Sequence, residues 1–140
     1  MDLAILKSEL IRDEGCELKP YTDTAGKITV GIGHNLTDKG ISAAICEALY
    51  EEDIGEVLKE LDDHLPWWAG LDPVRQRVLA NMAFNLGIMS LLGFHGTLIL
   101  IQTGRYEAAS EAMLGSLWAR QVGQRARRLA QMMATGKDAP

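Results

Sequence analysis

Three features of the sequence predict an α+β fold that is predominantly helical, with a small β-containing N-terminal lobe, a long linking helix and a helical C-terminal lobe. Extended, strand-like segments flank a turn signal between residues 17 and 32. Apolar residues then recur at helical spacing from residue 42 to about residue 65. Beyond that point, glycines divide a helical pattern into short segments. With 140 residues, 47% of them hydrophobic, the chain is large enough to bury one substantial core.

The N-terminal part is predicted to be a helix followed by a small antiparallel sheet. Asp2 is a suitable N-cap for an apolar stripe at helical spacing, and Gly15 ends this helix. Residues 17–21 contain a proline, which excludes a helix interior, and are predicted to be extended. The segment Asp23–Gly26 is typical of a turn, and Lys27–Ile32 alternates like a strand, so the two extended segments are expected to pair.

The rest of the chain is predicted to be helical. Ser42 can cap a helix that runs to about Leu65. Asp72 and Pro73 provide an N-cap and a first-turn proline for the next helix, and a last helix is expected at residues 124–134. The helices between them are punctuated by Gly93, Gly96, Gly104, Gly115 and Gly123.

The charge balance argues against a general nucleic-acid binder, because the formal net charge is −5 and the sequence pI is close to 5.1. Positive charge is nevertheless clustered near the C-terminus, at Arg120, Arg125, Arg127 and Arg128. A local basic patch of this kind suits an anionic polymer.

Cysteines and histidines predict neither a disulfide framework nor a metal site. Cys16 and Cys46 are the only cysteines and are expected to be reduced thiols. None of the three histidines, His34, His64 and His95, has a histidine or cysteine partner at metal-ligand spacing.

The most specific pattern lies between residues 14 and 34. Glu14 closes the first helix, Asp23 begins the turn and Thr29 lies in the following strand, with Gly-Ile-Gly-His behind them. Two carboxylates held apart on rigid elements are what cleavage of a glycosidic bond needs, because one protonates the leaving oxygen and the other manages water or the sugar cation. Either carboxylate alone would be an ordinary surface residue, but the ordered set indicates a glycoside-cleaving site.

This order of residues resembles the phage-type lysozymes, glycoside hydrolase family 24, which share Glu, eight residues, Asp, five residues, Thr and then Gly-x-Gly-His. The resemblance spans nearly the whole chain. It continues through Asn81–Gly87, Gly93-Phe94, Trp118 and Gln124–Ala126.

The resemblance implies a single lysozyme domain over residues 1–140, with a cleft between two lobes. One lobe, residues 13–60, carries the small sheet, and the other, residues 1–12 plus 61–140, is helical. The segment between His34 and Ser42 is shorter than in longer family members, so the N-terminal lobe is expected to be trimmed.

The resemblance assigns the catalytic roles to Glu14, Asp23 and Thr29. Glu14 is the general acid and must carry its proton near neutral pH, which burial favours and a nearby arginine opposes. Asp23 either activates a water, giving inversion at the anomeric carbon, or attacks as a nucleophile, giving retention. Thr29 is expected to help hold the attacking water, which favours inversion.

Supporting roles are implied for several further residues. Arg125 is expected to pair with Glu14, and Trp118 to support Arg125 rather than to stack on a sugar. Asn85 either binds an acetamido group of the substrate or is a satisfied buried amide.

Two positions near the turn are also singled out. Gly33 lets the backbone approach a neighbour closely, or simply bends the strand. The resemblance places Asp53, on the long helix, opposite His34, where a structural ion pair is expected rather than a catalytic role.

The function implied by the resemblance is hydrolysis of β-1,4 bonds between N-acetylmuramic acid and N-acetylglucosamine in bacterial peptidoglycan, causing host cell lysis. The enzyme is expected to be a monomer that needs no cofactor and no metal, with peptidoglycan glycan strands as its partner. Residues 1–7 include an early acid and no long apolar run, so no signal peptide and no membrane insertion are expected. The enzyme would be made in the bacterial cytoplasm and act on the periplasmic wall after release, which in this family usually depends on a phage-encoded holin.

Three other functions are alternatives for this sequence. A lytic transglycosylase cuts the same bond by internal attack of a sugar hydroxyl and needs only the acid, so Asp23 and Thr29 argue against it. A non-catalytic peptidoglycan-binding protein would be expected to lose Glu14 or Asp23. A small DNA-binding regulator would need a basic recognition face that this acidic chain mostly lacks.

Overall fold

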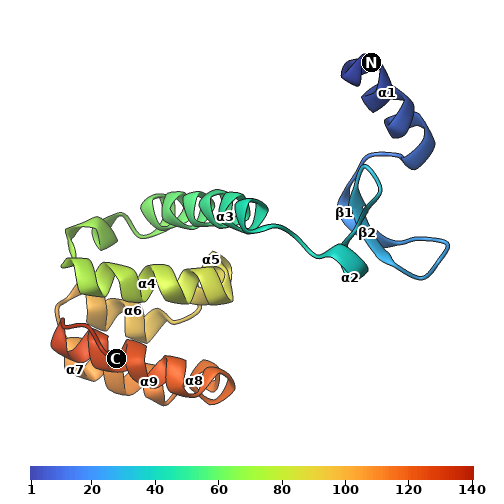
Figure 1. Cartoon of the computed structure of the whole chain (residues 1–140). Coiled ribbons are helices and arrows are strands. Elements are labelled where there is room, and N and C mark those ends of the chain that lie inside the picture. Colours follow the sequence, from blue (N-terminus) through green and yellow to red (C-terminus); the bar gives the residue numbers. More distant parts are fainter. The chain divides into compact units, whose positions relative to one another are not determined.

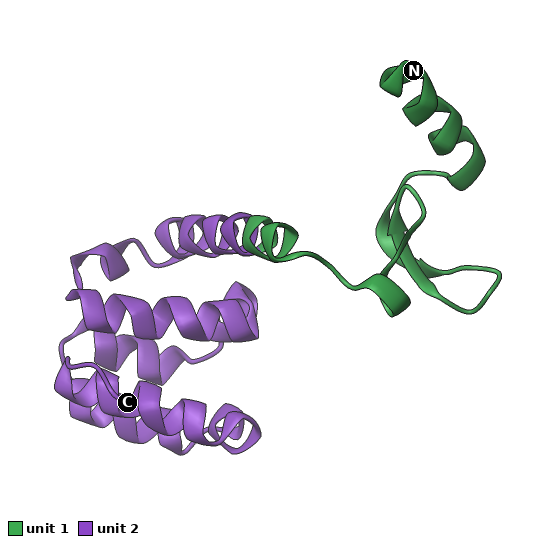
Figure 2. Ribbon diagram, viewed as in Figure 1, with its two compact units in different colours: residues 1–49 green, residues 50–140 purple.

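The computed structural model describes all residues 1–140 and is built from nine α-helices, one 3-10 helix and three short strands (Figure 1). The fold is therefore α+β and predominantly helical, as predicted. The chain divides into two compact units, unit 1 at residues 1–49 and unit 2 at residues 50–140 (Figure 2). The predicted lobes group residues 1–12 with the C-terminal helices instead, and that grouping stays a prediction.

Unit 1 begins with α1 (Leu3–Glu14), and both of its ends are where the sequence predicts them. The Asp2 carboxylate accepts hydrogen bonds from the amides of Ala4 and Ile5, which have no partner inside the helix. Gly15 follows with a φ of 81°, a conformation that favours glycine, and its amide donates to the Ile11 carbonyl.

The sheet of unit 1 is antiparallel, in the order β1 (Glu17–Thr22), β2 (Ile28–Gly31) and β3 (His34–Asn35). The predicted pair of strands is confirmed, and it places Tyr21 opposite Thr29. Because β2 is the central strand, Thr29 also lies opposite Asn35 of β3. Thr29 is the only buried residue of unit 1, with 3% of its surface exposed.

The sequence did not predict β3 or the short helix α2 (Leu36–Lys39) that follows it. Both elements are shorter than the repeat that a hydrophobic pattern needs to be recognised. The side chain of Asn35 caps α2, because its Oδ1 accepts a hydrogen bond from the Asp38 amide at 3.0 Å.

The long helix α3 (Ala43–His64) begins in unit 1 and continues in unit 2. Ser42 caps it as predicted, since its hydroxyl oxygen accepts a hydrogen bond from the Ile45 amide at 3.3 Å.

Unit 2 is entirely helical beyond α3. Its elements are η1 (Pro66–Gly70), α4 (Pro73–Leu86), α5 (Ile88–Leu92), α6 (His95–Gln102), α7 (Tyr106–Leu114), α8 (Leu117–Val122) and α9 (Gln124–Thr135). The predicted start of α4 at Asp72 and Pro73 and the predicted last helix are confirmed. No helix of the chain combines the length and the apolar composition needed to cross a bilayer.

The hydrophobic core lies in unit 2. Its largest fully buried side chains are Val78, Leu79, Met82, Leu91, Ile101, Met113, Met133 and Leu61. Arg75 of α4 links three helices of unit 2. Its guanidinium donates hydrogen bonds to the Met133 and Ala134 carbonyls at the end of α9 and lies 3.6 Å from the centre of the Tyr106 ring of α7. Unit 1 has no comparable core, so local hydrogen bonds order the segment that carries the catalytic pattern.

Candidate active site

Glu14 and Gly33 are in close contact within unit 1. Glu14 is the last residue of α1, and Gly33 lies between β2 and β3 with a φ of 66°. A Cβ on residue 33 would lie 3.0 Å from Oε2 of Glu14, which is tighter than ordinary van der Waals contact. The close approach considered for Gly33 is therefore present, and the neighbour is the predicted general acid.

Unit 1 leaves the side chain of Glu14 exposed. The burial expected around a general acid is therefore not supplied by the residues of this unit. The expected partner, Arg125, belongs to unit 2, so the ion pair between them stays a prediction.

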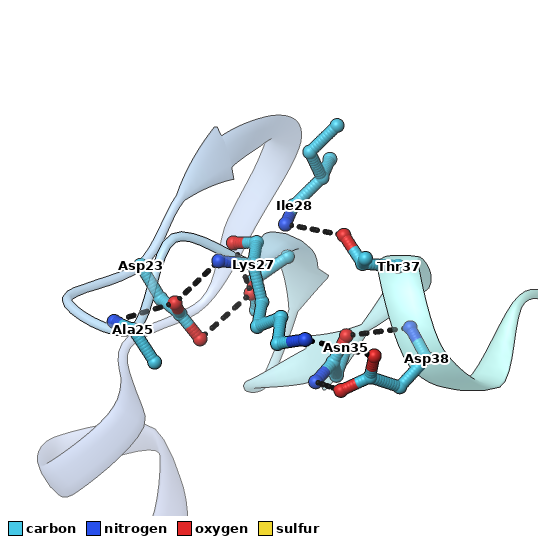
Figure 3. A network of polar contacts seen from close by, with 8 residues as sticks. Asp23, Ala25, Lys27, Ile28, Asn35, Thr37 and Asp38 are labelled. Atoms are coloured by element: carbon cyan, nitrogen blue, oxygen red, sulfur yellow. Dashed lines mark hydrogen bonds and ion pairs between the residues drawn. The ribbon is translucent and has the colours of Figure 1, made fainter.

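Asp23 is held by the backbone of its own turn (Figure 3). Its Oδ1 accepts hydrogen bonds from the amides of Ala25 at 2.9 Å and Lys27 at 2.8 Å. The Asp23 amide in turn donates to the Lys27 carbonyl at 2.8 Å. One carboxylate oxygen is thus fully used in fixing the side chain, and Oδ2 is left for other partners.

Thr29 provides the partner of Oδ2. Its Oγ1 lies 3.4 Å from Asp23 Oδ2 and 3.2 Å from the Lys27 carbonyl, so its single hydroxyl proton can be donated to either. The remaining lone pairs of Oγ1 can accept a hydrogen bond from a water. The structure therefore brings Asp23 and Thr29 together at the start of β2. It also brings Glu14 and Gly33 together beyond the end of the same strand.

His34 is engaged by the end of α2. Its Nε2 lies 2.6 Å from the Gly40 carbonyl, and because a carbonyl only accepts, Nε2 carries a proton. Only Nδ1 then remains for another partner. Asp53 lies in unit 2, so its expected ion pair with His34 stays a prediction.

Two polar pairs of unit 2 involve the expected supporting residues. Trp118 is buried, with 3% of its surface exposed, and its indole N–H donates to Asn85 Oδ1 at 2.9 Å. Asn85 is exposed rather than a buried amide, and its NH₂ group has no protein partner. Arg125 donates through Nε to Asn81 Oδ1 at 2.9 Å. Asn81 thus holds the Arg125 side chain, and the support expected from Trp118 stays a prediction.

Sequence reasoning missed the role of Asn81 and the contacts of Lys27 and Asp38 beside the turn. Asn81 had a usable signal, because it lies four residues before Asn85 and therefore on the same face of α4. Lys27 and Asp38 carried no signal beyond their opposite charges.

The structure holds no cluster of three or more histidine, cysteine, aspartate or glutamate side chains arranged for a metal ion. The chemistry available at the site is that of two carboxylates, a hydroxyl and the surrounding amides.

Comparison with known proteins identifies the family. The family model described as phage lysozyme matches residues 12–133, which covers most of the chain and includes Glu14, Asp23 and Thr29. The chain belongs to the phage lysozyme family. This membership makes it a hydrolase of the lysozyme type.

Relatives of the chain come from phages and from Dictyostelium discoideum. The pre-baseplate central spike protein Gp5 of Enterobacteria phage T4 is 32% identical over 91% of this chain, which spans only 27% of the spike protein's length. The protein named Probable T4-type lysozyme 1 of Dictyostelium discoideum is 28% identical, with 94% of both chains covered. The endolysin of Salmonella phage P22 is 32% identical over 79% of this chain and 78% of its own.

Two of the alignments are longer than the chain itself. Those with the spike protein and the Dictyostelium protein run over 155 and 160 residues, which is longer than the 140-residue chain. The two relatives therefore carry residues that this chain lacks.

Proposed function

We propose that the chain hydrolyses the β-1,4 bond between N-acetylmuramic acid and N-acetylglucosamine in bacterial peptidoglycan, with inversion at the anomeric carbon. The observation that carries this proposal is the contact at 3.4 Å between Asp23 of the turn and Thr29 of β2, the strand that is followed by Gly33 beside Glu14. A hydroxyl beside the second carboxylate supports the positioning of a water, which inversion requires and retention does not need in its first step.

In the proposed reaction, Glu14 donates its proton to the glycosidic oxygen as the bond to C1 breaks. A water held by Thr29 attacks C1 from the opposite face and gives its proton to Asp23. Because Oδ1 of Asp23 already accepts two amide hydrogen bonds, Oδ2 is the oxygen that takes this proton. Inversion predicts carboxyl groups roughly 6.5–9.5 Å apart, whereas retention needs about 5–5.5 Å.

The supporting residues take their roles from the same mechanism. Arg125, fixed by Asn81, pairs with Glu14 and orients it. Asn85, whose oxygen is held by Trp118, has a free NH₂ group that suits the carbonyl of an acetamido substituent. His34 and Asp53 form a structural ion pair.

These roles imply a single domain with a cleft between the lobes at residues 13–60 and residues 1–12 plus 61–140.

The biological setting proposed is host cell lysis. The enzyme acts as a monomer on peptidoglycan glycan strands, with no nucleic-acid partner and no cofactor. It is made in the bacterial cytoplasm and reaches the wall after release through a holin. The similarity to the phage P22 endolysin supports this setting.

The similarity to a phage spike protein supports a second setting for the same chemistry. There, the lysozyme would cut the wall locally as part of a larger phage assembly. Lysis from within by the expressed chain together with a holin distinguishes the first setting from the second.

The experiment that tests the chemistry is digestion of purified Gram-negative sacculi followed by analysis of the products. Hydrolysis gives new reducing ends, whereas a lytic transglycosylase gives anhydro ends and a wall-binding protein releases nothing. NMR of the first-formed product should show the α anomer at the new end. A β anomer at that stage would mean retention, with Asp23 as nucleophile.

A further inference from the structure

The helix α2 is fastened to the strand that carries Thr29 (Figure 3). The amide of Ile28, the first residue of β2, donates to Thr37 Oγ1 at 2.8 Å. The ammonium group of Lys27 lies 3.1 Å from Asp38 Oδ1. Because β3 is only two residues long, no backbone carbonyl of that strand pairs with Ile28, and the side chain of Thr37 supplies the acceptor.

The helix α2 is itself anchored at both ends. Asn35 caps it through the Asp38 amide, and the Asn35 NH₂ group donates to Asp38 Oδ2 at 2.9 Å. At the other end, Nε2 of His34 donates a hydrogen bond to the Gly40 carbonyl. A helix fixed in this way can set the position of the backbone at Lys27 and Ile28.

That backbone is the common partner of Asp23 and Thr29. The Lys27 amide donates to Asp23 Oδ1, and the Lys27 carbonyl accepts from the Asp23 amide and lies 3.2 Å from Thr29 Oγ1. A shift of the Lys27 peptide groups would therefore move the carboxylate and the hydroxyl together.

We propose that Thr37 and Asp38 are positioning residues for the hydrolysis. They act through Lys27 and Ile28 on Asp23 and Thr29 and do not themselves touch the substrate. This inference rests on the proposed function of the same site. No role was assigned to either residue from the sequence.

The first test compares Thr37→Val with Thr37→Ser. Valine keeps the branched shape but leaves the Ile28 amide without an acceptor, whereas serine keeps the hydroxyl. Misplacement by 1 Å can cost 10²-fold in rate, so a partial loosening in Thr37→Val should lower kcat on dye-labelled peptidoglycan by about 10-fold, with KM within about twofold. Thr37→Ser should stay close to wild type. A wild-type kcat for folded Thr37→Val would overturn the proposal.

The second test is a double-mutant cycle on the ion pair, with Lys27→Met, Asp38→Asn and their combination. If Lys27 and Asp38 affect kcat only through the ion pair between them, the double variant is no slower than the slower single variant. The matched control is Lys59→Met with Asp63→Asn, an exposed pair on α3 at 2.6 Å, which should leave kcat unchanged. Independent effects at residues 27 and 38 that multiply would contradict the proposal.

Hydrogen exchange at the Lys27 amide gives a readout that does not depend on activity. The proposal predicts faster exchange of this amide in Thr37→Val than in Thr37→Ser, because the turn around Asp23 is then less well held. Equal exchange in the two variants would overturn it. A wild-type protein that makes no new ends in sacculi would instead refute the proposed function, while the exchange data would still decide whether α2 holds the turn.

Discussion

Gly33 lies so close to Glu14 that a Cβ on residue 33 would be 3.0 Å from Oε2 and 3.2 Å from Cδ of the glutamate. The φ of Gly33 is 66°, so the position also requires a backbone conformation that other residues adopt at a cost. One glycine thus satisfies a conformational need and leaves room for the carboxylate of the proposed acid.

A comparison of Gly33→Ala with Gly31→Ala should distinguish the effect of the positive φ from the effect of the contact with Glu14. Gly31 has nearly the same φ, 67°, but nothing lies within 4 Å of its Cβ position. Each variant should lose about 1–2 kcal/mol in the free energy of unfolding, from the left-handed backbone. Only Gly33→Ala should also displace Glu14 and lower the rate of wall cleavage per folded molecule, by about 10-fold or more. Equal rates for the two variants would show that the contact with Glu14 is unimportant.

Asp72 should make stability depend on pH in the acid range. Its Oδ1 caps α4 and its Oδ2 accepts from the Arg75 guanidinium at 2.9 Å. Partial burial alone would raise the pKa of Asp72, but hydrogen bonds from the Arg75 amide and side chain, with the Arg75 charge, outweigh it and hold the pKa below 3.8. The stability gained is therefore complete at neutral pH and is lost as pH falls below 3.8 through the folded-state pKa.

Two variants distinguish the charge of Asp72 from its capping oxygen. Asp72→Asn keeps the capping oxygen and should cost under about 1 kcal/mol at neutral pH, a deficit that fades as the solution becomes acidic. Asp72→Ala also loses the cap and should cost about 1 kcal/mol more at every pH. Urea unfolding at neutral pH and in steps below pH 3.8 measures both effects. An asparagine deficit that stays constant over this range would rule out the charge as its cause.

The expected ion pair of His34 and Asp53 is tested by a double-mutant cycle in stability. His34→Gln retains a donor for the Gly40 carbonyl but removes the imidazole, and Asp53→Asn removes the carboxylate. The coupling free energy should be under about 1 kcal/mol for an exposed pair and larger for a partly buried one. The control cycle combines His34→Gln with Asp63→Asn instead of Asp53→Asn. Asp63 pairs with Lys59 and should show no coupling to His34. Additive effects in the first cycle would mean that the two residues do not interact.

The ends of the helices were predictable because single residues with known physical roles mark them. Asp2 and Asp72 cap helices with their carboxylates, and Gly15 adopts the positive φ that ends α1. The strand β3 and the helix α2 were missed because elements of two and four residues have no measurable periodicity.

The contact between Asp23 and Thr29 was predictable from sequence, but the contacts of the supporting residues were not. Asp23 begins the turn and Thr29 lies six residues later, on the strand that follows it, so local sequence places them together. Arg125 and Asn81 are 44 residues apart, and only the packing of α9 against α4 brings them into contact. Lys27 and Asp38 are 11 residues apart and meet because an unpredicted helix carries Asp38 back to the strand.

In the proposed mechanism, Glu14 supplies the proton for cleavage of the glycosidic bond. Glu14→Gln keeps the size of the side chain and removes the proton that can be transferred. General acid catalysis contributes about 10²–10⁴-fold, so the variant should lose at least about 10² in rate. Glu17→Gln, at an exposed glutamate three residues further along, is the matched control and should behave like wild type.

The most direct measurement is the rate at which each purified, folded protein clears a suspension of Gram-negative cells stripped of their outer membrane. Circular dichroism and thermal unfolding establish first that Glu14→Gln is folded as wild type is. Wild type and Glu17→Gln should clear the suspension rapidly, and Glu14→Gln should clear almost none of it. Clearing at the wild-type rate by folded Glu14→Gln would contradict the role of Glu14 and, with it, the proposed mechanism.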